Sequence, residues 1–276
     1  MDRPLDVGSV MVRSLLLSIT LFAATRSTPQ TTPRSTEPAA ELKSVAGHPM
    51  QYYVVRPEGW TRDRKWPIVV ALEAAEKEFK LNAERFAKAG RALPFIIVTP
   101  ITVSNGNAGQ RDQGVYPYSV ATWDRIDNDG VCAFDENGLA QVVKEVRTDY
   151  NGEDLIYLTG FEAGAHLVWA TVFHHPEWLA AAAPVAGNYR GRCVDGQPFS
   201  EAASRGSLPI RGFATEGDKF FGPGGAIFSQ WKDARTLAES RGYKNVSEVV
   251  VAGKDHVPLP AEVLGYFASL RKTPSR

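Results

Sequence analysis

The chain has 276 residues, of which 43% are hydrophobic and 22% are charged. This length and composition predict one large globular domain with a substantial core, and they leave little room for a second full domain. Lys and Arg together number 31, as do Asp and Glu, so no overall field favours nucleic acid or an anionic membrane as a partner. We therefore expect a small or neutral ligand.

Residues 1–25 have the pattern of a signal peptide. Basic Arg13 precedes the apolar run SLLLSITLFAA at 14–24, which is too short to span a bilayer comfortably. Met11 is an alternative start of translation to Met1, because ten residues precede the basic start. A mildly apolar, frayed tail is the alternative. We expect a secreted or periplasmic protein with no transmembrane segment in the mature chain.

The next segment, residues 26–45, is rich in Ser, Thr and Pro. Such a composition cannot bury enough apolar surface to pack, so it predicts a disordered linker. Residues 46–276 are then expected to form the single folded domain.

Short runs of β-branched and aromatic residues alternate with segments of helical periodicity from residue 50 onward. The expected strands cover 51–57, 67–72, 94–100, 154–160, 179–187, 209–215 and 246–253. The expected helices cover 77–90, 136–149, 163–174, 226–241 and 259–271. Several strands are continuously apolar, which is typical of strands buried on both faces. The alternation predicts an α/β fold with a mostly parallel central sheet and helices on both faces.

One segment, residues 101–130, lacks this periodicity and is expected to be a long irregular loop. Loops that leave the carboxyl end of a parallel strand commonly line a ligand site. Its aromatic residues Tyr116, Tyr118 and Trp123 are therefore candidates for stacking on a substrate. Packing of the loop onto the body of the domain would explain them equally well.

The only cysteines are Cys132 and Cys193. In an exported protein, such a pair predicts one disulfide, and two unpaired buried thiols are the alternative. No C-x-x-C motif is present, and DNDG at 127–130 lacks the spaced carboxylates of a calcium loop. We expect no metal and no cofactor.

The stretch LIYLTGFEAGAHLVWA, residues 155–170, reads as a strand, a tight turn and a helix. Many hydrolases hold a nucleophilic serine at the centre of such a turn, in the motif G-x-S-x-G. Here Gly160 and Gly164 occupy the glycine positions, and the central residue is Glu162. The amide of Ala163, at the helix start, would point toward a developing oxyanion.

Two further polar residues follow later strands. Asp218 comes after the expected strand at 209–215, and His256 comes after the strand at 246–253. Hydrolases with a catalytic triad on a parallel sheet place the nucleophile, the acid and the base in this order. Glu162, Asp218 and His256 are therefore predicted to meet at one site.

Residues 50–270 resemble the secreted esterases of the feruloyl-esterase and polyhydroxybutyrate-depolymerase-like group, within the α/β-hydrolase superfamily. The segments that carry the resemblance are DENGLAQVVKEV, IYLTGFEAGAHLVW, LAAAAPVAG, EGDKF and GKDHVP. This resemblance implies the α/β-hydrolase fold, with Glu162, Asp218 and His256 at the positions of the catalytic triad. It also implies an ester, aromatic or carbohydrate-like ligand, either a small molecule or one derived from a polymer.

The sequence departs from that group at two places. Glu162 stands where its members carry serine, and Glu73-Ala74-Ala75 replaces their His-Gly-Gly-like oxyanion turn. Backbone amides make the oxyanion hole, so Ala74 can still donate together with Ala163. Glu73 is expected to lie in the substrate pocket, where a second carboxylate would raise the pKa of its neighbour or attract a cation.

The missing serine leaves the enzymatic status open. Attack of a carboxylate on an ester would expel a poor alkoxide and give an anhydride, so ordinary acyl transfer by Glu162 is disfavoured. The leading hypothesis is a ligand-binding homologue with little or no hydrolysis. The alternative is an active hydrolase, in which Glu162 attacks an alkyl carbon or activates water together with His256. An ion pair between Glu162 and protonated His256 would instead give a catalytically quiet pocket.

Overall fold

The computed structural model describes residues 39–105, 111, 114–189 and 192–272. The predicted signal peptide and most of the predicted linker lie outside these ranges. Within them, we find no helix with the length and apolar character that a membrane crossing requires.

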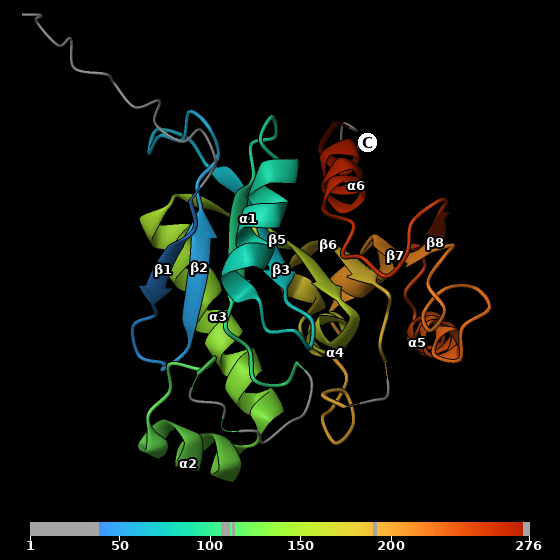
Figure 1. The fold of residues 1–276 in the computed structure, drawn as a ribbon, viewed down its shortest axis with the longest axis horizontal. Coiled ribbons are helices and arrows are strands. Elements are labelled where there is room, and N and C mark those ends of the chain that lie inside the picture. The colour runs from blue at the N-terminus through green and yellow to red at the C-terminus, as the bar shows by residue number, and fades with distance from the viewer. Residues whose placement is uncertain (1–38, 106–110, 112–113, 190–191, 273–276) are drawn as a thin grey trace, which may run out of the picture. The chain divides into compact units, whose positions relative to one another are not determined.

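One sheet of eight strands forms the centre of the domain, in the order β1-β2-β4-β3-β5-β6-β7-β8 (Figure 1). The strands are β1 (Glu41–Ser44), β2 (Gln51–Val55), β3 (Trp66–Leu72), β4 (Ile96–Pro100), β5 (Gly152–Phe161), β6 (Leu179–Val185), β7 (Ile210–Thr215) and β8 (Val246–Val251). β2 runs antiparallel to both β1 and β4, whereas all neighbouring pairs from β4 to β8 are parallel. The structure confirms the predicted α/β fold with a mostly parallel sheet.

Helices cover both faces of this sheet. They are α1 (Phe79–Ala89), α2 (Val120–Asp129), α3 (Val131–Asp149), α4 (Ala165–His174), α5 (Phe228–Ser240) and α6 (Pro260–Lys272). On β3, Val69 and Ala71 belong to a buried cluster with residues of α1 and α6. Ile68 and Val70 belong to a second cluster with residues of α3, α4 and α5. Burial on both faces explains why β3 is apolar without interruption.

The linker prediction was wrong at its C-terminal end, because Glu41–Ser44 form the edge strand β1. Leu42 lies opposite Tyr53 of β2, yet Leu42 is 48% exposed. An edge strand of this kind is held by backbone hydrogen bonds and by surface pairs such as Arg56 with Glu41, at 2.8 Å. Neither contribution leaves an apolar signal in the sequence.

The segment 101–130 was predicted to be irregular throughout, but its C-terminal part forms α2. The hydroxyl of Ser119 caps this helix by accepting the Thr122 amide at 3.2 Å. Only Trp123 and Ile126 of α2 are buried. Two buried positions are too few to give a clear helical periodicity, which explains why the prediction missed this helix.

The three aromatic residues assigned to the substrate pocket lie in the core. Tyr116, Tyr118 and Trp123 are 4%, 6% and 1% exposed, and the ring centroids of Tyr116 and Trp123 are 5.4 Å apart. The Tyr118 hydroxyl donates to the carbonyl of Ile101 at 2.7 Å. These contacts correct the assignment and support the alternative, in which the rings pack the segment onto the domain.

Cys132 and Cys193 form a disulfide, as predicted. Cys132 lies in the first turn of α3, and Cys193 lies in the connection after β6. The bond therefore joins α3, which precedes β5 in the sequence, to a loop that follows β6.

A buried ion pair joins α3 to α4. Glu136 of α3 contacts His174 of α4, with 3.1 Å between the carboxylate oxygen Oε1 and Nδ1. Burial acts to raise the pKa of Glu136, but His174 and His175 outweigh it and lower the pKa. The hydrogen bond to Glu136 raises the pKa of His174 against the opposing effect of burial.

These shifts predict that the contribution of the Glu136–His174 pair to the stability of the fold depends on pH. The pair stabilises the fold fully between the ordinary pKa values of Glu and His, about 4.3 and about 6.5. Its contribution falls as the pH drops through the lowered pKa of Glu136, or rises through the raised pKa of His174. Glu136→Gln should therefore lower the free energy of unfolding by about 1.5–3 kcal/mol within that window, and by less outside it. Denaturant unfolding across the pH range measures this, with Glu177→Gln as the exposed control; a difference that does not vary with pH would contradict it.

Candidate active site

Glu162 lies at a strained turn between β5 and α4. Its φ is +48°, a left-handed conformation that costs a residue with a side chain on the order of 1–3 kcal/mol. A short 3₁₀ turn over Glu162–Gly164 follows and leads directly into α4. The arrangement places Glu162 directly after the carboxyl end of β5.

The two flanking glycines are required by close backbone approaches. A Cβ on Gly160 would lie 2.6 Å from the carbonyl oxygen of Gly164. A Cβ on Gly164 would lie 2.7 Å from the Glu73 carbonyl oxygen and 2.8 Å from that of Leu72. All three distances are too short for a Cβ atom, so neither position can carry a side chain. The turn from Gly160 to Gly164, called the elbow from here on, thus packs against the end of β3 and the turn that follows it.

Asp218 and His256 form a hydrogen-bonded pair. Asp218 follows β7 and His256 follows β8, and Oδ2 of Asp218 lies 2.6 Å from Nδ1 of His256. The other carboxylate oxygen accepts the amides of Phe220 and Phe221, each at 2.9 Å. Burial opposes ionisation of Asp218, but these amides and His256 outweigh it, so its pKa lies below the ordinary value. Asp218 can therefore orient the imidazole and leave Nε2 for chemistry.

The imidazole of His256 lies beside the elbow. Its ring centroid is 4.6 Å from that of Phe161, the residue before Glu162. On another side, the Phe221 ring stacks on it at 5.2 Å. Two phenyl rings and one carboxylate thus fix the orientation of the base.

The Glu162 carboxylate accepts a backbone hydrogen bond from the turn after β3. The donor is the amide of Ala75, 3.3 Å from Oε2, one residue beyond the predicted donor Ala74. Ala163, the other predicted donor, is 4% exposed in the turn after Glu162. Among the residues that the structure describes, no ion pair joins Glu162 to His256, so the ion-pair hypothesis gains no support.

Sequence reasoning assigned no role to Asn105, which holds the Glu73-Ala74-Ala75 turn. Its side chain is 2% exposed, and Nδ2 donates to the Ala74 carbonyl at 2.9 Å. The Tyr116 hydroxyl donates to Oδ1 of Asn105 at 3.2 Å. Asn105 lies in the aperiodic segment 101–130, where one Asn among several carries no distinguishing pattern.

A cleft of about 600 Å³ opens beside His256. Phe161, Val257 and Pro258 give it apolar walls, and Glu73 contributes a carboxyl group. Burial raises the pKa of Glu73 to about 7, so this carboxyl group is partly neutral at physiological pH. Glu73 and His256 thus line the same cleft.

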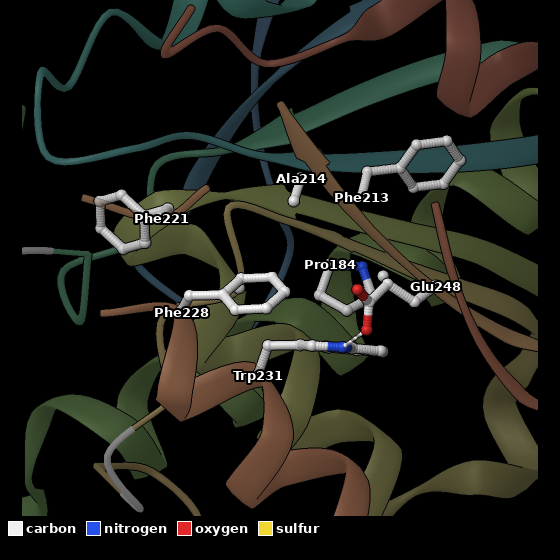
Figure 2. A pocket seen from close by; sticks show the side chains of 9 residues that line it. Pro184, Phe213, Ala214, Phe221, Phe228, Trp231 and Glu248 are labelled. Atoms are coloured by element: carbon white, nitrogen blue, oxygen red, sulfur yellow. Dashed lines mark hydrogen bonds between the residues drawn. The ribbon is translucent and has the colours of Figure 1, made fainter. Parts of the chain in front are cut away.

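A second pocket is lined by residues of β6, β7, β8, α5 and their connections, among them Phe213, Phe228 and Trp231 (Figure 2). Its volume is about 10 Å³, which holds one water molecule at most. The indole of Trp231 donates to Glu248 across it. This space is a packing gap, and the cleft beside His256 remains the candidate ligand site. Within the described ranges, no group of three or more His, Cys, Asp or Glu residues could hold a metal ion.

No family model matches the sequence, and no curated protein matches it. Solved structures do. A poly(3-hydroxybutyrate) depolymerase from Bordetella parapertussis is similar, with a TM-score of 0.58 and 18% identity over 86% of this chain and 92% of the other. A feruloyl esterase module from Clostridium thermocellum in complex with sinapinate has a TM-score of 0.50 and 13% identity, over 85% of this chain and 88% of the other.

A thermostable esterase is also similar, with a TM-score of 0.53 and 19% identity over 86% of this chain. The chain spans 63% of the length of that esterase. These likenesses confirm the expected resemblance at the level of the fold. Together with the strand order and the elbow between β5 and α4, they show that the chain has the α/β-hydrolase fold.

Proposed function

We propose that this protein is an exported, esterase-like member of the α/β-hydrolase fold that binds its ligand with little or no hydrolysis. One observation carries the proposal: the Glu162 carboxylate accepts the Ala75 amide. That amide stands where an esterase would stabilise a developing oxyanion. A carboxylate in this place both removes the serine nucleophile and competes for the donor.

The cleft beside His256 supports an apolar or aromatic ester as the ligand. Its walls include the Phe161 ring and the Val257 side chain, and pockets for small molecules are typically apolar with a few polar groups. Solved neighbours include a feruloyl esterase module bound to sinapinate, which is consistent with an aromatic ligand here. The disulfide supports an exported protein, because such bonds persist in oxidising compartments.

Binding without turnover is the direct test. An aryl ester such as ethyl ferulate should raise the melting temperature in a saturable way, while the release of ferulate stays at the rate without protein. Val257→Arg should weaken binding at least tenfold, because it places a charge at the apolar cleft. Val250→Arg is the matched control, since Val250 is 40% exposed and Val257 is 37% exposed. Equal loss in both variants, or no saturable binding by the parent, would contradict the proposal.

The intact Asp218–His256 pair favours one alternative function. Glu162 could attack an alkyl carbon, forming a carbon–oxygen bond while a carbon–halogen or epoxide carbon–oxygen bond breaks. His256 would then deprotonate a water that hydrolyses the resulting ester. Incubation with an epoxide or alkyl halide, followed by mass spectrometry, should show an adduct on Glu162 if this chemistry operates. His256→Gln should make that adduct persist.

A further inference from the structure

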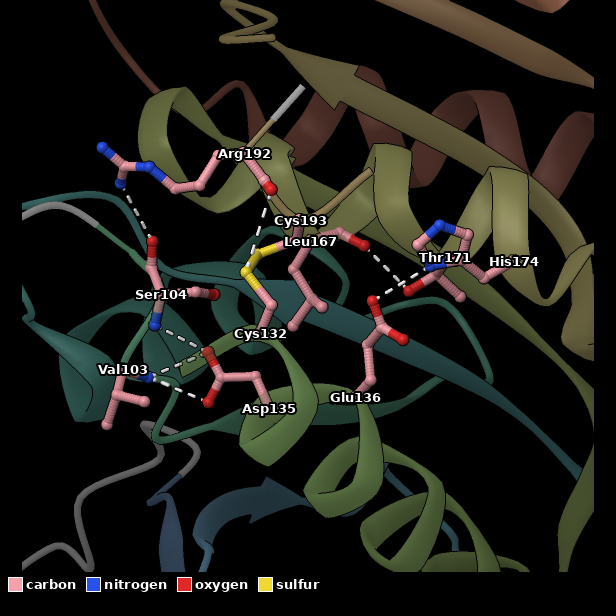
Figure 3. Close-up of a disulfide and its surroundings, with 10 residues drawn as sticks. All are labelled: Val103, Ser104, Cys132, Asp135, Glu136, Leu167, Thr171, His174, Arg192 and Cys193. Atoms are coloured by element: carbon pink, nitrogen blue, oxygen red, sulfur yellow. Dashed lines mark hydrogen bonds and ion pairs between the residues drawn. A yellow bond between two sulfur atoms is a disulfide. The ribbon is translucent and has the colours of Figure 1, made fainter. Parts of the chain in front are cut away.

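A buried carboxylate on α3 holds the loop that follows β4. Asp135 is fully buried, and its oxygens accept the amide of Val103 at 2.9 Å and that of Ser104 at 2.7 Å (Figure 3). Burial raises the pKa of Asp135 to about 7, although these amides act against it. The two amides would be unpaired donors in the core without Asp135. The loop is therefore fixed to the first turns of α3.

The disulfide holds the same loop from its other side. Arg192 precedes Cys193, and its Nη1 donates to the Ser104 carbonyl at 3.2 Å. Cys193 is bonded to Cys132, which lies one turn from Asp135 on α3. Figure 3 shows Ser104 between Arg192 and Asp135. The amide of Ser104 is thus held by the helix, and its carbonyl by the segment that is cross-linked to that helix.

Asn105 transmits this anchoring to the turn after β3. It follows Ser104 directly, and its Nδ2 lies 2.9 Å from the Ala74 carbonyl and 3.5 Å from that of Glu73. The Ala74 carbonyl belongs to the same peptide group as the Ala75 amide, which donates to Glu162. Because a peptide group is planar, a bond that fixes its carbonyl also fixes the direction of its N–H.

We propose that Asn105 is a positioning residue that aims the Ala75 amide at the side chain of residue 162. In this proposal, the Cys132–Cys193 disulfide and Arg192 keep Asn105 in place through Ser104. The inference rests on the proposed function in one respect, because it takes the Ala75 amide to be the oxyanion donor of that same site. It adds that the oxyanion donor is set by a cross-linked loop, separate from the Asp218–His256 pair.

Removal of the Asn105 amide tests the proposal. In Asn105→Ala, the Ala75 amide should exchange with solvent at least tenfold faster, as measured by NMR. Its chemical shift should also move toward the value that it has in Glu162→Ala, in which the carboxylate acceptor is absent. Asn82→Ala is the matched control, because the buried Asn82 of α1 donates from Nδ2 to the carbonyl of Ala71 at 3.1 Å, and Ala71 lies within β3, before the turn that carries Ala75. It should leave both readouts at Ala75 unchanged.

The paired variant Cys132→Ser with Cys193→Ser tests the anchor and does not depend on Asn105→Ala folding. It should accelerate exchange at Ala75 severalfold, with no change in the chemical shifts of His256. Exchange at Ala75 within twofold of the parent in either variant would overturn the proposal, as would an equal change in Asn82→Ala. These readouts require no turnover. They decide the positioning role even if the ligand-binding function proposed above is wrong.

Discussion

Replacing Glu162 with serine should produce an esterase whose kcat/KM for an aryl ester exceeds that of the parent by about 10³ or more, since triad members contribute on that order or above. The change removes the carboxylate from the Ala75 amide and supplies a hydroxyl nucleophile next to Phe161, whose ring contacts His256. His256 is already oriented, with 2.6 Å between its Nδ1 and Asp218. Steady-state hydrolysis of a short-chain and a feruloyl-type ester, at matched concentrations, measures the gain.

Two control variants separate the effects of this substitution. Glu162→Ala frees the Ala75 amide without adding a nucleophile, so it should stay close to the parent. The combination of Glu162→Ser with His256→Ala should lose nearly all of the gain, because no base remains to take the serine proton. If the parent itself turns over and Glu162→Ser is no faster, the carboxylate is catalytic and the binding function is wrong.

Gly164→Ala should destabilise the fold by about 3 kcal/mol or more, at the upper end of the cost of overpacking. The added Cβ would lie 2.7 Å from the Glu73 carbonyl oxygen and 2.8 Å from that of Leu72. Both atoms belong to the backbone, so no side-chain rotation can relieve the clash. Either the elbow moves away from β3 or the turn that carries Ala75 shifts.

Gly265→Ala is the matched control for Gly164→Ala. Gly265 lies within α6, and a Cβ there meets nothing within 4 Å. Alanine in an open helical position should stabilise the fold by up to about 1 kcal/mol. Denaturant unfolding of both variants measures the contrast. Similar stability of Gly164→Ala and the parent would show that the elbow does not need its close approach to β3.

The sequence predicted the features that depend on local pattern. The apolar run of β3 predicted the parallel sheet, because burial on two faces restricts residue type directly. The glycine pair around Glu162 predicted the elbow, because close backbone approach does the same. Asp218 and His256 were found because each follows its own strand in a known order. Their hydrogen bond could not be read from the sequence and required the register of β7 and β8.

Features held by backbone groups or by contacts distant in the sequence were missed. β1 is an exposed edge strand, and α2 buries only two side chains. The amide that donates to Glu162 is that of Ala75, one residue beyond the predicted donor Ala74. The shape of a turn decides which amide points inward, and both candidates are alanine. Asn105 acts on a carbonyl 31 residues away, and no local pattern marks such a contact.

The disulfide also has a consequence for the unfolded chain. Cys132 and Cys193 are 61 residues apart, and the elbow at Glu162 lies inside the loop that they close. Loop closure of this length lowers the entropy of the denatured ensemble by an amount worth about 4 kcal/mol. That exceeds the cost of one left-handed residue such as Glu162. The stabilisation by the cross-link therefore exceeds the cost of the strained turn. A chain with a reduced disulfide would have to form the same turn without this stabilisation.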